Sequence, residues 1–212
     1  MQKIVIIGGG GHAKVLIDII FTSKNYEILG IIDSQVNESS EVCGIPVIGN
    51  DGMLQGLYAK GVKNVGIGVG SVRDNNKRKN LYIKVKQTGF FTPTLIHPRS
   101  IVSTRTQISD GVQIMAGVII GSDSFIGNNT IINTGAIIEH DCIINSHVHI
   151  CSGAVISGGC KIEEGAFIGA GSIMIQGLKI GVNAVVAAGA VVIKDVPANS
   201  QVAGVPAKIM NK

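Results

Sequence analysis

The chain is poor in aromatic side chains. Only 4% of its 212 residues are Phe, Tyr or Trp, and Trp is absent, although 45% are hydrophobic. This excludes the common kind of core that is built around large aromatic rings. The sequence instead contains 29 glycines and much Ile, Val and Ala. Such a mixture is typical of many short, tightly packed strands joined by turns that need positive φ.

Long uninterrupted apolar runs are also missing. Gly, Asn or a charged residue breaks every apolar stretch before it reaches the length of a membrane span, so no membrane partner is expected. Residues 1–7 run directly into a glycine loop and are too short for a signal peptide. The four cysteines form neither a secreted disulfide pattern nor a CxxC metal pair. We therefore expect a cytoplasmic protein.

The chain has little excess charge of either sign. Its 18 basic and 14 acidic residues give a net charge of +4, and the basic residues are scattered. The one run, Lys77-Arg78-Lys79, is interpreted as the solvated face of a helix. No nucleic-acid partner is expected, whereas a few cations could meet the phosphates of a small ligand.

The strongest positive signal is a six-residue repeat in the second half. Sixteen consecutive positions at steps of six, from Val102 to Val192, are aliphatic, and small or β-branched residues dominate four places after each of them. A period of six fits neither an α-helix nor a flat strand. It fits a short strand plus a corner, three of which form one triangular coil. Residues 102–196 thus predict a prism of about five coils, roughly 25 Å tall, with the aliphatic residues at its centre. Cys142 and Cys160 then stack one coil apart, as reduced core fillers.

The first half has the pattern of a small α/β domain. A buried strand over 3–7 leads into Gly8-Gly9-Gly10-Gly11-His12-Ala13, and an apolar helical pattern follows. Gly8, Gly10 and Ala13 satisfy G-x-G-x-x-[GA], which lets backbone N–H groups approach a phosphate at a helix N-terminus. A second strand over 27–32 ends at Asp33, where an acid commonly meets a ribose hydroxyl. A tight turn without a ligand would explain the glycines almost as well.

Further strands near 45–49 and 64–69 and helices near 51–60 and 72–87 complete this unit. At about 90 residues it is short for a dinucleotide domain, so one nucleotide is favoured over NAD. We expect domain boundaries at 1–97 and 98–212.

A polar break at Glu139-His140-Asp141 interrupts the repeat. The register places His140 and Asp141 at a prism corner, pointing outward, with Gly158 stacked one coil above. A slender ligand could lie across that corner, and the alternative is a solvated turn histidine.

His149 lies nine residues after His140, which is half a coil. The two belong to different sides of one prism, so a site that uses both must lie between neighbouring subunits. His147 shares neither register and is interpreted as a surface or interface histidine. Three nearby histidines raise a zinc alternative, but these spacings do not bring three ligands to one point, so no metal is expected.

Four segments together resemble one family. They are Gly-Gly-Gly-Gly-His-Ala-Lys at 8–14, Ile-Asn-Thr-Gly-Ala-Ile-Ile-Glu-His-Asp at 132–141, His149, and Gly-Val-Pro-Ala-Lys at 204–208. The chain resembles the sialic acid O-acetyltransferase and PglD-type sugar acetyltransferase family over essentially its whole length. The resemblance implies a Rossmann-like nucleotide-sugar-binding domain followed by a left-handed parallel β-helix, and a homotrimer that uses acetyl-CoA.

The resemblance also implies residue roles. His140 matches the general base and Asp141 the acid that orients it. Asn133, His149 and the Gly158 backbone match positions that line the acetyl and pantetheine end of acetyl-CoA. Gly204 to Lys208 resembles the tail that lies near the adenine end of CoA. The nucleotide-sugar cradle is matched by Gly8, Gly10, Gly11, His12 and Asp33.

Two departures from the family pattern concern the nucleotide. Ser34 stands where a second acid is common, and Ala13 where Gly is common. The first function we consider is N-acetylation of a UDP-4-amino-sugar. The alternatives are O-acetylation of sialic acid or a related sugar, and a catalytically silent hexapeptide scaffold.

Overall fold

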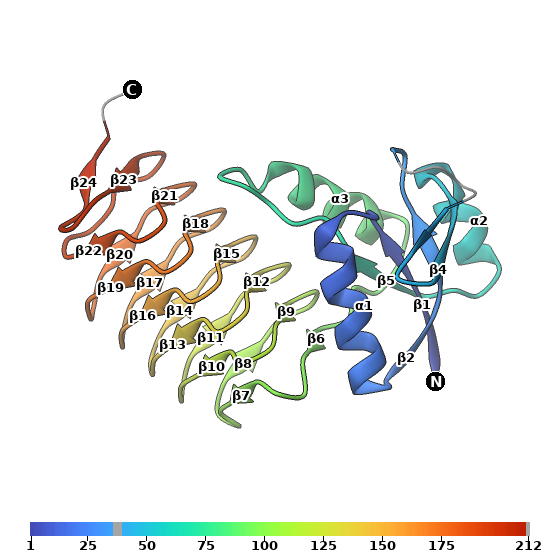
Figure 1. The fold of residues 1–212 in the computed structure, drawn as a ribbon, viewed down its shortest axis with the longest axis horizontal. Helices are drawn as coiled ribbons and strands as arrows, with labels where there is room; N and C mark the ends of the chain where they lie inside the picture. Colours follow the sequence, from blue (N-terminus) through green and yellow to red (C-terminus); the bar gives the residue numbers. More distant parts are fainter. Residues whose placement is uncertain (36–39, 211–212) are drawn as a thin grey trace.

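A computed structural model describes residues 1–35 and 40–210. Figure 1 shows an N-terminal α/β domain beside a tall parallel β-helix, with helix α1 (Gly11–Ser23) between the sheet and the prism and the C-terminus at the far end of the prism. The two parts share their packing, because one hydrophobic core cluster contains residues of both.

The N-terminal domain is built on a five-stranded sheet in the order β3-β4-β2-β1-β5. Its strands are β1 (Gln2–Ile7), β2 (Tyr26–Ile32), β3 (Glu41–Val42), β4 (Ile45–Gly49) and β5 (Asn64–Ile67), and only β3 is antiparallel to its neighbour. The other helical segments are η1 (Asp51–Met53), α2 (Leu54–Ala59) and α3 (Asn76–Gln87).

Strand β1 is buried on both faces, as expected for the centre of a parallel sheet. Ile4 and Ile6 pack into the cluster that contains α1 and the prism, whereas Val5 and Ile7 pack into a second cluster with α2 and α3. The alternation has a period of two because successive side chains of a strand point to opposite faces.

The second part is a triangular prism of two-residue strands. They are β6 (Leu95–Ile96), β7 (Ile101–Val102), β8 (Gln107–Ile108), β9 (Gln113–Ile114), β10 (Ile119–Ile120), β11 (Phe125–Ile126), β12 (Ile131–Ile132), β13 (Ile137–Ile138), β14 (Ile143–Ile144), β15 (His149–Ile150), β16 (Val155–Ile156), β17 (Lys161–Ile162), β18 (Phe167–Ile168), β19 (Ile173–Met174), β20 (Lys179–Ile180), β21 (Val185–Val186) and β22 (Val191–Val192).

Three sheets form the faces of the prism, and all their strands except β24 run parallel to their neighbours. Face A runs β7-β10-β13-β16-β19-β22, and face B runs β8-β11-β14-β17-β20. Face C runs β6-β9-β12-β15-β18-β21-β23-β24. From β6 to β19, each strand pairs with the strand three further along, as Ile138 does with Ile156, so one coil takes 18 residues.

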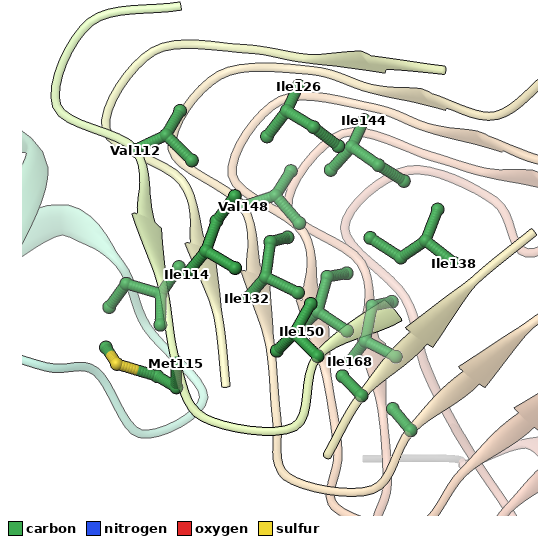
Figure 2. Close-up of a cluster of buried hydrophobic side chains, with 14 of the residues drawn as sticks. Val112, Ile114, Met115, Ile126, Ile132, Ile138, Ile144, Val148, Ile150 and Ile168 are labelled. Atoms are coloured by element: carbon green, nitrogen blue, oxygen red, sulfur yellow. The ribbon is translucent and has the colours of Figure 1, made fainter. Parts of the chain in front are cut away.

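The second residue of each strand fills the prism centre, as the repeat predicts. From Ile114 to Val192 these side chains are at most 1% exposed, and Figure 2 shows several of them stacked along the axis. At the start of the prism, Ile96 of β6 is 37% exposed, and Val102 and Ile108 of the first coil are partly exposed. Each buried aliphatic side chain stabilises the fold by about 1.5–3 kcal/mol.

The corners explain much of the glycine content. The second residue of most corners has positive φ, and glycine takes this place nine times between Gly111 and Gly189. Asp141 (φ 58°) and His147 (φ 61°) are among the exceptions. Asp and Asn tolerate positive φ better than most residues, so Asp141 can occupy this corner position although it lacks the conformational freedom of glycine.

The junction between the two parts is made by β6 and α3. β6 already pairs with β9 of the prism, upstream of the boundary expected between 97 and 98, which stays a prediction. Residues 211 and 212 of the expected second domain lie outside the described residues. The Asn75 side-chain amide donates to the carbonyls of His147 and Gly165, at 2.8 and 3.0 Å.

The chain ends in a short hairpin on the last coil. β23 (Gln201–Ala203) continues face C, and β24 (Lys208–Ile209) returns antiparallel to it. No helix within the described part of the chain is long and apolar enough to cross a membrane.

Candidate functional site

His140 and Asp141 form an exposed corner between faces A and B. The corner follows β13 and precedes β14, and the two side chains are 65% and 64% exposed. His140 Nδ1 lies 2.7 Å from Asp141 Oδ2. This bond leaves Nε2 of the imidazole facing away from the carboxylate, with no protein hydrogen bond among the described residues. The pair has the arrangement of a general base and the acid that orients it.

The carboxylate sets the proton affinity of this histidine. The hydrogen bond to Asp141, together with the charges of Asp141 and Glu139, raises the pKa of His140 above its usual value. A raised pKa makes the neutral imidazole a stronger proton acceptor once it forms.

The ring of His140 packs over Gly158, the residue that the register stacks above it. A Cβ at position 158 would come within 2.6 Å of His140 Cε1 and 2.7 Å of Nε2. The sequence predicted an uncovered corner for a ligand. The structure places the imidazole itself in the space that a side chain would fill.

His149 lies on face C, away from this corner, and is 5% exposed. Its Nδ1 is 2.7 Å from Ser71 Oγ, and its Nε2 is 3.3 Å from Asn133 Nδ2. Phe167 meets the ring edge-to-face at 5.3 Å. Since the Asn133 amide donates, Nε2 is an acceptor and the proton of the neutral ring is on Nδ1.

His12 joins the two parts of the chain, although sequence analysis grouped it with the nucleotide cradle. Its Nε2 lies 2.7 Å from Gln113 Oε1 on face C, and Gln113 Nε2 donates to the Ile67 carbonyl. Burial and the nearby Arg78 lower the pKa of His12 to about 3 and that of His149 to about 4. Both rings are therefore neutral at physiological pH.

Arg78 is the buried cation at this junction. It donates from Nη1 to the carbonyls of Ile67 and Val69, and from Nε to that of Asn129. Burial lowers its pKa to about 9. Its guanidinium ties the end of β5 to a prism corner.

A second candidate site lies at the carboxyl ends of the parallel strands. This pocket, of about 290 Å³, is lined by Gly8, Asp33, Ser34, Asp51, Val69, Lys77 and other residues of α3, and it is called the nucleotide pocket after the ligand that the sequence predicts for it. Gly8 has φ +97°, and a Cβ there would press against Val69. Asp33 Oδ2 accepts the Gly9 N–H at 2.6 Å, so this acid fixes the glycine loop. Gly10 and Gly11 follow, at the start of α1.

A groove continues along face C toward the tail. Its volume is about 420 Å³, and it extends from Cys151 and Phe167 to Met210 along a floor of small residues: Gly169, Ala170, Ala187, Ala188 and Ala203. Gly204 turns the chain at φ +99°, and Lys208 lines a separate apolar pocket on the last coil.

The predicted residues thus fall into five places. His140, Asp141 and Gly158 meet at one corner, Asn133 and His149 lie on face C, and Gly8 and Asp33 line the nucleotide pocket, with Gly10 and Gly11 following at the start of α1. His12 lies at the junction with Gln113, and Gly204 and Lys208 lie at the tail. Their roles stay predictions. One chain does not bring His140 and His149 together, because they lie on different sides of the prism.

Several residues of these sites were not predicted from the sequence. Lys77 lines the nucleotide pocket, Arg78 is buried and Lys79 pairs with Glu164 at 2.6 Å, so the basic run does not form one solvated face. Gln113 stands two coils below His149, which the 18-residue register could have indicated. No sequence signal pointed to Ser71. Among residues 1–35 and 40–210, no group of three or more His, Cys, Asp or Glu side chains could hold a metal ion.

Comparisons with known proteins match both parts of the chain. The PglD N-terminal domain matches residues 3–85, the bacterial transferase hexapeptide (six repeats) residues 123–158, and the hexapeptide repeat of succinyl-transferase residues 159–194. A search of curated proteins gave no match.

Several solved structures are similar over the whole length. PerB from Caulobacter crescentus, in complex with CoA and GDP-perosamine, is 38% identical with a TM-score of 0.92, over 100% of this chain and 98% of that one. A perosamine N-acetyltransferase from the same organism, with one histidine replaced by asparagine, is 37% identical over the same shares, with a TM-score of 0.94. The acetyltransferase domain of PglB from Neisseria gonorrhoeae FA1090, in complex with acetyl coenzyme A, is 33% identical with a TM-score of 0.92, over 99% of each chain. These matches confirm the expected fold class.

Proposed function

Because the chain belongs to the family of PglD-type sugar acetyltransferases, we propose that it transfers the acetyl group of acetyl-CoA to the amine of a nucleotide-linked amino sugar. The observation that carries the proposal is the 2.7 Å hydrogen bond between His140 and Asp141 at an exposed corner. A silent scaffold would not need an oriented imidazole there. The acceptor proposed is a UDP-4-amino-sugar.

The chemistry follows from the corner. Nε2 of His140 takes a proton from the sugar amine while the amine nitrogen forms a bond to the carbonyl carbon of the thioester. Asp141 holds the tautomer with the proton on Nδ1 and stabilises the imidazolium. The C–S bond then breaks, and the proton held by His140 passes to the departing thiolate. Because a thiolate is a good leaving group, no acyl-enzyme is needed.

The Gly158 amide has a proposed part in the same step. Its N–H makes no hydrogen bond within the described chain, and it is next to the His140 ring. A free backbone donor beside the base is suited to stabilise the negative charge that develops on the carbonyl oxygen.

Small residues make the face C groove a fitting channel for the pantetheine arm. The groove begins beside His149 and ends near the tail hairpin. In this arrangement Asn133 and His149 hold the acetyl end of the arm. Gly204 and Lys208 hold the adenine end.

A homotrimer completes the site in this proposal. Five aliphatic residues on face A or directly after its strands are between 39% and 67% exposed: Ile101, Ile119, Ile173, Ile175 and Ile193. Face A is bordered by the His140 corner on one edge and by face C on the other. If three copies turn face A toward a threefold axis, the His140 corner of each meets face C of the next.

The test is release of free CoA thiol from acetyl-CoA, assayed with UDP- and GDP-linked amino sugars and with sialic acids. We expect turnover with an amino-sugar nucleotide and no turnover with its hydroxyl analogue. Acetylation of sialic acid alone would contradict N-acetylation, and no thiol release with any acceptor would contradict the proposal as a whole.

A further inference from the structure

Ser71 of the N-terminal domain is hydrogen-bonded to His149 of the prism. Ser71 lies in the segment between β5 and α3, and its Oγ is 2.7 Å from His149 Nδ1. The amide of Asn133 fixes the direction of this bond. Its Oδ1 accepts the N–H of Thr134 at 2.8 Å, so its Nδ2 is the group that faces His149 Nε2, at 3.3 Å. Nε2 is therefore the acceptor, and the single proton of the neutral ring lies on Nδ1 and is donated to Ser71.

Both ring nitrogens of His149 are thus engaged within one chain. The side chain is 5% exposed, and Phe167 meets the ring edge-to-face at 5.3 Å. The group that this arrangement leaves for a ligand is the second N–H of the Asn133 amide, which has no partner among the residues that the structure describes. How well that N–H is oriented depends on the ring of His149, because the ring holds the other N–H of the same amide.

The segment that carries Ser71 is anchored independently of this bond. Two residues before Ser71, the carbonyl of Val69 accepts a hydrogen bond of 2.8 Å from Arg78 Nη1. Four residues after it, the Asn75 amide donates to the carbonyl of His147 at 2.8 Å. Arg78 and Asn75 are only 2% and 6% exposed. Because buried side chains anchor the segment on both sides, its hydroxyl can hold the histidine ring in place.

The same segment borders both pockets. Val69 lines the nucleotide pocket, whereas Val72 and Arg73 line the face C groove. Ser71 lies between them in the chain and contacts His149, beside which the groove begins. The N-terminal domain therefore contributes to the groove on the prism, and Ser71 is its polar contact there.

We propose that Ser71 is a positioning residue for acetyl-CoA: its Oγ holds the ring of His149, and the ring holds the Asn133 amide so that one N–H is left for a carbonyl oxygen of the acetyl-pantetheine arm. This rests on the proposed function, because it requires that the face C groove takes acetyl-CoA. The loss of one such hydrogen bond corresponds to about a 10-fold change in affinity.

The experiment measures the binding of acetyl-CoA to the wild type, Ser71→Ala, Ser71→Thr and Ser100→Ala by calorimetry. Ser100 is the matched control, because its Oγ makes an equally short hydrogen bond of 2.7 Å, to the His97 carbonyl at the start of the prism. We expect Ser71→Ala to weaken acetyl-CoA binding about 10-fold, and the binding of UDP or GDP less than about twofold. Ser71→Thr keeps the hydroxyl and should restore most of the loss, and Ser100→Ala should resemble the wild type.

Two further readouts separate positioning from a merely structural contribution. In a His149→Ala background, Ser71→Ala should weaken acetyl-CoA binding by less than about twofold, because the ring that it holds is already gone. The proton NMR spectrum of the wild type should show a slowly exchanging imidazole proton on Nδ1 of His149. This signal should be lost in Ser71→Ala and kept in Ser71→Thr.

The inference is overturned if Ser71→Ala binds acetyl-CoA as the wild type does, if its loss is equally large in the His149→Ala background, or if His149 carries its proton on Nε2. Acetyl transfer together with unchanged acetyl-CoA binding in Ser71→Ala would overturn the inference alone. Binding that depends on Ser71, without transfer to any acceptor, would support the inference and contradict the proposed function. A wild type that binds no acetyl-CoA would overturn both.

Discussion

The imidazole of His140 occupies the space in which a side chain at Gly158 would lie, with the hypothetical Cβ only 2.6 Å from Cε1. Gly158→Ala should therefore displace the ring from its place beside the Gly158 amide and lower kcat about 10- to 100-fold. The fold should persist, since an exposed ring can turn aside and this glycine does not have positive φ.

A double variant isolates the cause. In a His140→Ala background, Gly158→Ala should produce little further loss, because the ring that it displaces is already gone. Additive losses in the double variant would show that Gly158 acts independently of His140.

Removing the base should be more severe than disturbing it. His140→Ala is expected to lower kcat about 100- to 10,000-fold, with acetyl-CoA binding nearly unchanged. Near wild-type turnover would rule out His140 as the base.

Asp141→Asn should move the pH dependence of the reaction. The hydrogen bond and charge of Asp141 raise the pKa of His140, so the base becomes neutral, and active, only above its usual titration range. Asn removes the charge and still tolerates φ 58°. We expect a lower kcat and an acid limb of kcat/KM shifted to lower pH. An unmoved limb would show that Asp141 does not set this pKa.

His149 should make the fold sensitive to acid. Its pKa is about 4 when folded, against 6.5 for an ordinary histidine, so the unfolded chain binds more protons between these values. Stability should fall as pH drops from 6.5 toward 4, and His149→Gln should flatten this slope in thermal unfolding. His140→Gln is the control and should not flatten it, because the pKa of His140 is shifted upward. Equal slopes in the wild type and His149→Gln would contradict this account.

Mixed assemblies test whether two chains complete the site. His140→Ala and His149→Ala subunits, co-expressed, should regain part of the activity that each lacks, because some interfaces combine an intact His140 corner with an intact face C. A mixture of His140→Ala and Asp141→Asn should gain nothing over Asp141→Asn, since both changes lie at one corner. No gain in the first mixture would contradict the shared site.

The prism register can be tested with neighbouring residues. Ile144 is fully buried, whereas Ile143 is 42% exposed. Ile144→Asn should destabilise the fold by several kcal/mol, because an unpartnered amide would lie at the prism centre. Ile143→Asn should lower the melting temperature much less. Similar melting temperatures would contradict the register.

The sequence predicted the prism well because its repeat is local. Each coil is defined by the one before it, so the positions of Ile144, His140 and Gly158 follow from counting by 18. The docking of one domain on another leaves no such period. That is why the contacts of His12 with Gln113 and of Ser71 with His149 were not predicted. The basic run at 77–79 was misinterpreted for a similar reason. Lys77 lines the pocket, Arg78 is buried at the junction, and Lys79 forms an ion pair with Glu164.

The attachment of α3 to the prism is made largely to main-chain oxygens. Asn75 donates to the carbonyls of His147 and Gly165, and Arg78 to that of Asn129. Every amino acid has the same backbone carbonyl, so these hydrogen bonds do not depend on the side chains at the corner as long as its backbone conformation is kept. Over evolutionary time the corner side chains are thus free to diversify while the N-terminal domain stays attached, so the two parts of the chain can be altered separately.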